Sequence, residues 1–340
     1  MPSKFKLVGV DARGDYKISA WQSEISDQIY KFILDRLPKN ETILAKSAQH
    51  HFALQGKMLR AKMALHAAST LKIDATSAMH WAVAVEVLHN ASLIHDDVCD
   101  DDQYRRGRRS VWSKYGRNIA LTLGDWLVAL AFELAAEAGQ RSQTPLLVKI
   151  LAQHMATTTA GEAAEFALNL PPDWEEYVGI AADKTAPLLT APLEGIAAMA
   201  LQMNSTSGIE VYFRSLGTAY QIANDIMNFR QLDTTENQGS DLTRRAPNAI
   251  VVLYRQGLTG KSAASFDEWY MSGSTSNIQK YHEDILKSEA TVQSAYKMQE
   301  ILKKSDSLVT TLPTGFLEAI YPVRALLEEV CMKSIAPVNC

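Results

Sequence analysis

Three long segments carry apolar residues at helical spacing and contain few residues that break a helix. They are residues 79–97, 118–138 and 208–229. Apolar side chains that recur every three or four residues indicate helices packed into a core, and strand-like alternation is hard to find elsewhere. The 340 residues include only 17 glycines and 11 prolines, which argues against a turn-rich β architecture. No repeat or linker-like tract divides the chain, so we expect an all-α, single-domain helical bundle over residues 1–340.

Charge and cysteine usage exclude several classes of protein. The formal net charge of -4 gives no general nucleic-acid-binding surface. Three cysteines, at positions 99, 331 and 340, show neither zinc-ligand spacing nor a disulfide framework. No uninterrupted apolar run reaches the length of a membrane span, and the first forty residues do not resemble a signal peptide. We therefore expect a cytoplasmic protein without a membrane span or a nucleic-acid partner.

The segment LIHDDVCDDDQYRRGRR, residues 93–109, crowds charges of one sign and then of the other. Five aspartates fall within residues 96–102, and four arginines follow within residues 105–109. On a helix, Asp96, Asp97 and Asp100 project from one edge and repel one another unless a divalent cation neutralises them. Oxygen ligands suit Mg²⁺, and arginine suits phosphate. An acidic helix end would explain the aspartates alone, whereas a metal–diphosphate site explains both halves.

Residues 86–107 and 115–134 resemble the first aspartate-rich region of the trans-isoprenyl diphosphate synthases, the polyprenyl synthetase family. They read EVLHNASLIHDDVCDDDQYRRG and YGRNIALTLGDWLVALAFEL. Further matches follow the order of the family's motifs: QGKMLRAKM at 55–63, GEAAEF at 161–166, DKTA at 183–186 and YQIANDIMNF at 220–229. The resemblance covers residues 45 to 255, is closest to the geranylgeranyl diphosphate synthases, and is more specific than any single motif.

The resemblance implies a helical bundle around a central apolar cavity, and a homodimer. It implies a Mg²⁺-dependent reaction, with Mn²⁺ as a substitute, in which an allylic diphosphate condenses with isopentenyl diphosphate to a longer prenyl diphosphate. It implies metal ligands at Asp96, Asp97, Asp100 and Asp225, and catalytic roles for these four with Lys184 and Gln221. It places Arg105, beside Lys184 and Gln221, on the allylic diphosphate. The implied substrate-binding residues are Lys57, Arg60, His89, Arg105, Arg106, Thr185 and Arg245, of which Lys57, Arg60, His89 and Arg106 would hold isopentenyl diphosphate.

The second aspartate-rich motif departs from the family's DDxxD. Asn224 and Asn228 stand where carboxylates are usual, and only Asp225 remains. An amide oxygen can bind a hard cation, but without the charge. The family also places a lysine soon afterwards, where this chain has Arg244 and Arg245. We therefore expect weaker metal binding on this side of the pocket.

Several functions remain open. The chain could be a slower elongating synthase, an enzyme that joins two allylic diphosphates irregularly, a class I terpene cyclase or a non-catalytic regulatory subunit. The cyclase motif ends in Ser or Thr and Glu, where this chain has Asn228 and Leu232, and a cyclase needs no second-substrate pocket. A regulatory subunit would be expected to lose both motifs, yet the first is intact. We favour the two-substrate prenyltransferase.

Small residues precede the first motif. In this fold the growing tail is expected to run along the helix before Asp96, where it meets Ser92 and Ala91. Neither side chain is large enough to stop the tail, and Leu88 and Trp81 are candidates for a deeper stop. We predict a product of C20 or longer, geranylgeranyl diphosphate being favoured.

Overall fold

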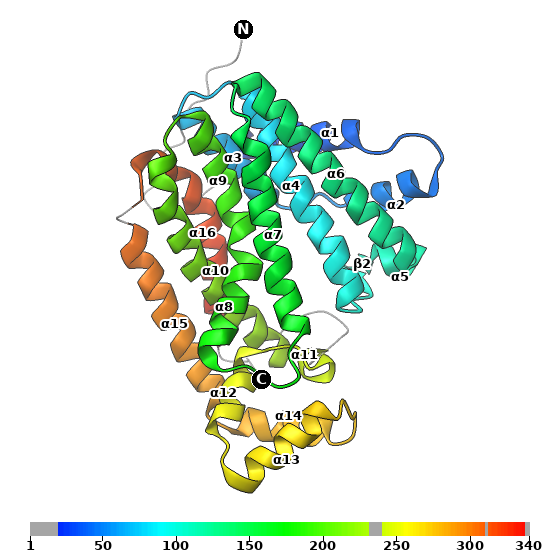
Figure 1. The fold of residues 1–340 in the computed structure, drawn as a ribbon, viewed down its shortest axis with the longest axis vertical. Helices are drawn as coiled ribbons and strands as arrows, with labels where there is room; N and C mark the ends of the chain where they lie inside the picture. Colours follow the sequence, from blue (N-terminus) through cyan, green and yellow to red (C-terminus); the bar gives the residue numbers. More distant parts are fainter. Residues whose placement is uncertain (1–19, 231–239, 310–311, 337–340) are drawn as a thin grey trace.

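The computed structural model describes residues 20–230, 240–309 and 312–336, and confirms the all-α prediction. Long helices run side by side through the body of the molecule (Figure 1). These are α3 (Leu59–Thr70), α4 (Ala75–Cys99), α6 (Arg117–Ser142), α7 (Leu146–Phe166), α9 (Pro187–Met199), α10 (Thr206–Phe229) and α16 (Thr314–Ile335). The prediction of a single domain over the whole chain stays a prediction.

Shorter elements surround this bundle. The first two helices lie to one side of it, and α13 and α14 cover its lower end in Figure 1. The remaining helices are α1 (Ala20–Arg36), α2 (Ile43–Phe52), α5 (Val111–Tyr115), α8 (Trp174–Thr185), α11 (Ser240–Arg244), α12 (Ala249–Gly257), α13 (Gly260–Met271), α14 (Ile278–Lys287), α15 (Ala290–Val309) and a 3₁₀ turn, η1 (Met203–Ser205). Two short strands, β1 (Tyr104–Arg105) and β2 (Arg108–Arg109), pair as an antiparallel hairpin.

The core forms because α4 and α10 are apolar over most of their surface. Helix α4 packs along α6, and its residues Trp81 to Leu88 are all buried. Helix α10 joins two apolar clusters: Ile209 to Leu216 belong to the larger one, and Ala219 to Phe229 belong to the smaller one. Both helices therefore end at fixed positions in a rigid frame.

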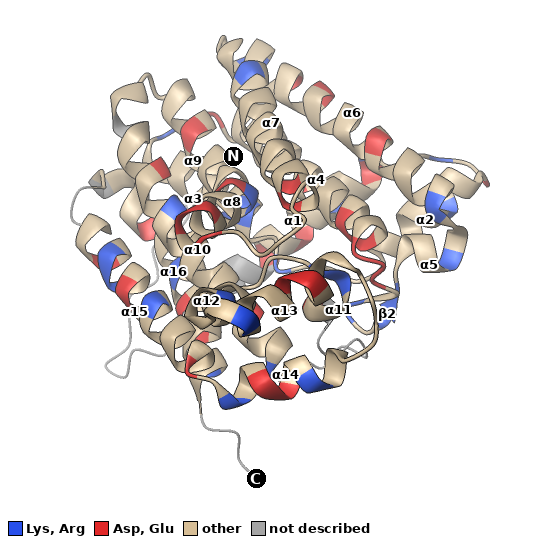
Figure 2. Cartoon of the chain, turned by 60° about the horizontal axis from the view of Figure 1, so that its bottom comes forward, with Lys and Arg blue, Asp and Glu red and all other residues tan. Residues whose placement is uncertain are grey.

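Helix α4 delivers the first aspartate motif to one end of the bundle. The start of the helix is capped by Asp74, whose side chain accepts a hydrogen bond from the backbone N–H of Ser77 at 2.8 Å. It ends at Cys99, so that Asp96 and Asp97 occupy its last turn and Asp100 caps it. We call this end of the bundle the aspartate end. Figure 2 shows the molecule with this end turned forward, and acidic residues of α4 lie near basic residues around β2.

Within the described part of the chain, α6 is the one helix long and apolar enough to cross a membrane. Length and composition alone give this result, and the core helix of a bundle has the same composition. Because α6 packs along α4, it gives no support for a membrane span.

Candidate active site

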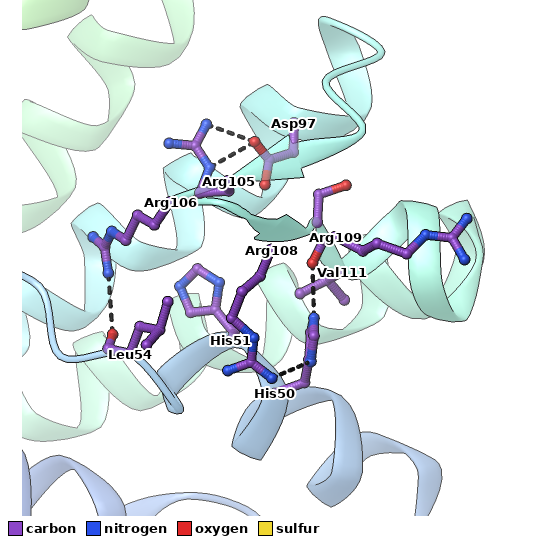
Figure 3. Close-up of a pocket in the computed structure, with 10 residues that line it drawn as sticks. His50, His51, Leu54, Asp97, Arg105, Arg106, Arg108, Arg109 and Val111 are labelled. Atoms are coloured by element: carbon purple, nitrogen blue, oxygen red, sulfur yellow. Dashed lines mark hydrogen bonds and ion pairs between the residues drawn. The ribbon is translucent and has the colours of Figure 1, made fainter. Parts of the chain in front are cut away.

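The carboxylate of Asp97 is buried at the end of α4. Its side chain is 2% exposed, and Arg105 Nε donates to its Oδ1 at 2.6 Å (Figure 3). Burial raises the pKa of Asp97, although the Arg105 guanidinium opposes this shift. Asp97 is therefore held by the arginine that was predicted to contact the allylic diphosphate. A diphosphate at this point would have to share Arg105 with Asp97.

The hairpin of β1 and β2, which follows α4, sets the positions of the arginine side chains. Its two-residue turn has Arg106 at φ +53° and Gly107 at φ +73°, the left-handed conformation that a tight hairpin requires. The turn lays the Arg106 guanidinium against Gly56, where a Cβ would come within 2.9 Å of Nη2. Arg106 Nη1 also donates to the carbonyl oxygen of Leu54 at 3.3 Å (Figure 3). Because Gly56, in the GK segment, has no side chain, the Arg106 guanidinium can pack against it.

Asp96 faces further carboxylates from α7. Burial raises the pKa of Asp96 to about 7, and the negative charge of Glu162 adds to the shift. Lys184, in the last turn of α8, binds Glu162 Oε2 at 2.8 Å and Glu165 Oε2 at 2.5 Å. Burial alone would lower the pKa of Lys184, but Glu165 and Glu162 outweigh it and raise that pKa. Lys184 is therefore charged and fixed near Asp96, and its role as a diphosphate ligand stays a prediction.

Gly161 lets α7 and α8 approach this closely. A Cβ on Gly161 would lie 3.0 Å from the backbone carbon of Asp183 and 3.0 Å from the backbone nitrogen of Lys184. A second glycine, Gly217 of α10, leaves similar room for the side chain of Thr185, with a Cβ–Cγ2 distance of 3.1 Å. The end of α8 is thus wedged between two glycines, which fixes Lys184 and Thr185.

A second group of cations surrounds His89. Burial lowers the pKa of His89 well below its usual value, and the positive charges of Arg60, Arg105 and Arg106 lower it further. The ring is therefore neutral beside three guanidinium groups, which is the electrostatic setting of an anion site. Of the four residues predicted to bind isopentenyl diphosphate, three come together here. Lys57 lies exposed in the loop between α2 and α3, and no contact of its side chain with the other three is seen.

A proline in α9 positions Arg60. Pro192 lies inside the helix and has no N–H, so the carbonyl of Leu188, four residues earlier, lacks its helical donor. Arg60 Nε donates to that carbonyl oxygen at 3.0 Å. On its other side Arg60 feels the negative charge of Glu86, a buried residue of α4 that accepts a hydrogen bond from the Ala61 N–H at 3.2 Å.

His50 and His51 of α2 line a small basic pocket together with the arginines of the hairpin (Figure 3). His50 Nε2 lies 2.8 Å from the carbonyl oxygen of Arg109, and because a carbonyl only accepts, this nitrogen carries the proton. The His50 Nδ1 atom then accepts from Lys114 at 3.1 Å and from Arg108 at 3.4 Å. Among the described residues, Arg106, Arg108 and Lys114 make no ion pair with a carboxylate. The pocket thus holds uncompensated positive charge.

The second motif does not provide an open carboxylate. Asp225, in α10, is 2% exposed, and its Oδ2 accepts from Tyr177 Oη at 2.6 Å and from the Ala249 N–H at 2.8 Å. Gln221 Nε2 donates to Oδ1 at 2.9 Å. The predicted roles of Asp225 as a metal ligand and of Gln221 as a diphosphate ligand are not supported by this arrangement. Asp225 joins α8, α10 and α12 through these bonds, and Gln221 holds Asp225 from within α10.

Of the two arginines that follow this motif, Arg244 and not Arg245 contacts the first aspartate motif. Arg245 was predicted to bind substrate, but its guanidinium donates to the carbonyl oxygens of Leu242, Tyr270 and Ser274 at 2.5, 3.2 and 2.7 Å. It also lies over the Trp269 ring, 3.8 Å from the ring centre. Its neighbour Arg244 forms an ion pair with Asp100 instead. The backbone of Arg245 is left-handed, at φ +61°, and this turn sends the two side chains in different directions.

The predicted chain-length residues lie on α4, as expected. Ala91 and Leu88 are buried, and Ser92 is half-buried with its hydroxyl donating to the carbonyl oxygen of His89 at 2.9 Å. Trp81 is fully buried against α9, where its indole Nε1 donates to the carbonyl oxygen of Pro192 at 3.1 Å. A Cβ at Gly195 would overlap the indole ring. Trp81 is therefore a rigid group at the far end of this row, and its role as a stop stays a prediction.

The first motif fits a divalent cation and the second does not. Asp96 carries a raised pKa because it is buried beside Glu162, so a positive ion would relieve its surroundings. Among the described residues, no three Asp, Glu, His or Cys side chains gather closely enough to hold an ion by themselves. Mg²⁺ usually takes only one or two carboxylates and completes its shell with water and substrate phosphates. Asp96 and Asp100, next to the basic residues, suit that mode of binding.

A comparison with protein families agrees with these observations. Residues 41–289 match the model of the family described as polyprenyl synthetase. The chain belongs to the polyprenyl synthetase family. Among curated relatives, a short chain isoprenyl diphosphate synthase of Methanocaldococcus jannaschii is 30% identical over 216 residues, which are 62% of this chain and 65% of that protein. A geranylgeranyl diphosphate synthase of Saccharolobus solfataricus is 31% identical over 217 residues, again 62% and 65% of the two chains.

Solved structures of polyprenyl synthetases share the fold over nearly the whole length. A polyprenyl synthase from Caulobacter crescentus, complexed with calcium and isoprenyl diphosphate, has a TM-score of 0.74 and 26% identity, and covers 93% of this chain and 96% of its own. A decaprenyl diphosphate synthase from Rhodobacter capsulatus has a TM-score of 0.76 and 21% identity, with 93% and 97% covered. This polyprenyl synthetase therefore has the family's fold well beyond residues 45–255.

Several residues of the site had no role assigned from the sequence. Glu162 and Glu165 hold Lys184, and the GEAAEF segment was their only signal. Tyr177 donates a hydrogen bond to Asp225, which lies 48 positions later in the sequence, and no local sequence pattern predicts such a pair. His50 and His51 lie in a helix whose sequence carries no family motif.

Proposed function

We propose that this polyprenyl synthetase is a trans-prenyltransferase that condenses an allylic diphosphate with isopentenyl diphosphate. The observation that carries the proposal is the meeting of two cation groups with the first aspartate motif at one end of the bundle. Arg105 and Lys184 lie beside Asp97 and Asp96, while Arg60 and Arg106 lie around the neutral His89, with Arg105 between the two groups. Two diphosphates are accommodated by two such groups, whereas a one-substrate cyclase needs one.

The residues divide the work as follows. Lys184 and Arg105 draw negative charge from the allylic diphosphate, so that its C–O bond breaks and the diphosphate leaves with the electron pair. Arg60 and Arg106 hold isopentenyl diphosphate, whose double bond attacks the allylic carbon, and a proton is then lost. Bound Mg²⁺, held by Asp96 and Asp100, would supply Lewis-acid stabilisation of the leaving diphosphate. No protein nucleophile is needed, so positioning and electrostatics account for the catalysis.

The chain length of the product is proposed from α4. Ala91 and Ser92 present small side chains before the first motif, and neither can act as a floor. We therefore propose a product of C20 or longer, geranylgeranyl diphosphate being favoured. The curated relatives include both short-chain and long-chain synthases, such as an all-trans-nonaprenyl-diphosphate synthase of Rhodobacter capsulatus that is 27% identical over 255 residues.

A homodimer is proposed from the surface of α6 and α7. These helices leave a shallow hollow of about 550 Å³. Its lining is almost wholly apolar, so its exposure to water is unfavourable. Its lining consists of Phe132, Ala152, Met155, Ala156, Thr159, Ala160 and Ala163. A second copy of the chain would cover it. Light scattering at the mass of a monomer, at micromolar concentration, would contradict this proposal.

The function is tested by substrate requirement. Purified protein is incubated with Mg²⁺ and with isopentenyl diphosphate alone, an allylic diphosphate alone, or both, and the products are separated by chain length after phosphatase treatment. We expect products lengthened by five-carbon units only when both are present. Products formed from the allylic diphosphate alone would instead indicate irregular coupling or cyclisation, and a lack of any product would indicate a regulatory subunit.

A further inference from the structure

Among the residues that the structure describes, the second motif offers no accessible carboxylate to a metal ion. Asn224 and Asn228 carry no charge, and Asp225 is buried under three hydrogen bonds from Tyr177, Ala249 and Gln221. Both lone pairs of its Oδ2 are used, and its remaining oxygen faces the Gln221 amide. A Mg²⁺ ion needs accessible carboxylate oxygens, since it keeps most of its waters. The donor set of this motif therefore does not fit the metal.

Arg244 brings a fixed positive charge to the same side. Its Nη1 pairs with Asp100 Oδ1 of the first motif, and its Nη2 donates to Asp241 Oδ1 at 3.0 Å. Asn248 Nδ2 in turn donates to Asp241 Oδ2 at 3.0 Å and to the backbone carbonyl of Asp225 at 3.2 Å. The guanidinium is thus tied to both motifs, and about a quarter of its side chain is exposed.

The Nε–H donor of Arg244 remains available. Its Nε–H is buried and has no acceptor among the described residues. A buried N–H without an acceptor costs free energy, and a phosphate oxygen is a suitable acceptor for it. The planar guanidinium can offer Nε–H and one Nη–H together to two oxygens of one phosphate. This orphaned donor, beside Asp100, marks Arg244 rather than Arg245 as the diphosphate ligand.

We propose that Arg244 binds the allylic diphosphate directly and replaces the metal ion that the second motif cannot hold, so that metal binding is confined to the first motif. The proposal rests on the proposed function. Asn224 and Asn228 replace two carboxylates, and Arg244 adds one guanidinium on the same side of the site. Because the two negative charges are absent, the permanent positive charge of Arg244 is enough to attract the diphosphate without a metal ion. On binding, Arg244 exchanges its ion pair with Asp100 for the phosphate, which leaves Asp100 to the metal.

The first test counts metal ions. Mn²⁺ bound per protein chain is measured from the electron paramagnetic resonance signal of free Mn²⁺, in the presence of inorganic pyrophosphate and against buffer containing the same pyrophosphate. The wild type is compared with the variant that carries Asn224→Asp and Asn228→Asp. We expect the double variant to bind more Mn²⁺ than the wild type. Equal numbers would overturn the proposal, because the second motif would then make no difference to metal binding.

The second test measures the affinity for inorganic pyrophosphate by isothermal titration at fixed Mn²⁺. Arg244→Gln should weaken binding by roughly tenfold or more, the effect typical of losing a charge-assisted hydrogen bond. Arg255→Gln is the matched control, since Arg255 is similarly half-buried and paired with one aspartate, Asp267. Its affinity should equal that of the wild type. If Arg244→Gln binds pyrophosphate as tightly as Arg255→Gln does, the proposal is wrong. Neither test uses turnover, so each can fail while elongation is observed.

Discussion

Replacing Gly161 with alanine should damage the site from a distance. The added Cβ would meet three atoms of Asp183 and Lys184 at 3.0 Å, two of which belong to the backbone. Ordinary carbon contacts lie at about 3.5–4.0 Å, so the end of α8 must retreat by about 0.5–1 Å. Lys184 moves with its own backbone nitrogen and loses its bonds to Glu162 and Glu165, which are 2.8 and 2.5 Å long.

The magnitudes follow from this displacement. Overpacking costs about 1–3 kcal/mol, and alanine in a helix regains about 1 kcal/mol over glycine, so Gly161→Ala should lose up to about 2 kcal/mol of stability. A misplacement of about 1 Å at a catalytic group can cost up to about 100-fold, and we expect kcat/KM to fall by roughly tenfold or more. Urea unfolding and steady-state kinetics measure the two effects.

Gly179→Ala is the matched control. Gly179 lies inside α8 as Gly161 lies inside α7, but a Cβ there would meet nothing within 4 Å. This variant should gain about 0.5–1 kcal/mol and keep its activity. The reasoning is refuted if the two variants have the same stability and the same kcat/KM.

Three further predictions follow from single residues. Ala91→Phe should shorten the product toward C15 in a chromatographic product assay, with Ala91→Ser as the control; a wild type that stops at C15 or C10 would show that another helix supplies the floor. Burial lowers the pKa of His51 to about 4, so the unfolded chain binds the extra proton between about pH 4 and 6.5. Stability is therefore lost as the pH falls, by about 2 kcal/mol from this residue between pH 8 and 5, and His51→Gln should flatten that part of the urea-unfolding profile, whereas an unchanged profile would contradict the shift. Pro192→Ala returns an N–H that competes with Arg60 for the Leu188 carbonyl, so the KM for isopentenyl diphosphate should rise several-fold while that for the allylic diphosphate stays constant; equal changes in both would indicate a general loss of packing.

Local patterns in the sequence were sufficient to predict the bundle and its aspartate end. The apolar spacing of residues 79–97 specifies α4, and the helix carries Asp96 and Asp97 wherever it packs. The resemblance to the family assigned roles to Lys184, Arg60 and His89, and the structure places Lys184 near Asp96 and Arg60 near His89, while their roles in substrate binding stay predictions. These predictions depended on short-range order, which a sequence shows directly.

The predictions that the structure did not support depended on contacts between distant residues. Nothing near Asp225 shows that Tyr177, 48 positions earlier, fills its oxygen. The choice between Arg244 and Arg245 turned on one left-handed residue, and an arginine at φ +61° cannot be recognised from its identity. The position of Arg60 agrees with the resemblance, but its acceptor, the Leu188 carbonyl 128 positions away that Pro192 leaves without a helical donor, could not be predicted.

The central claim is that the first aspartate motif and the adjoining cations hold two diphosphates for metal-dependent carbon–carbon bond formation. The most direct measurement is the incorporation of radiolabelled isopentenyl diphosphate into solvent-extractable product, with an allylic diphosphate and Mg²⁺, for the wild type and for the variant with Asp96→Asn and Asp100→Asn. We predict incorporation by the wild type that EDTA abolishes and Mg²⁺ or Mn²⁺ restores, and little or none by the variant. Incorporation that survives EDTA, or a variant as active as the wild type, would contradict the account.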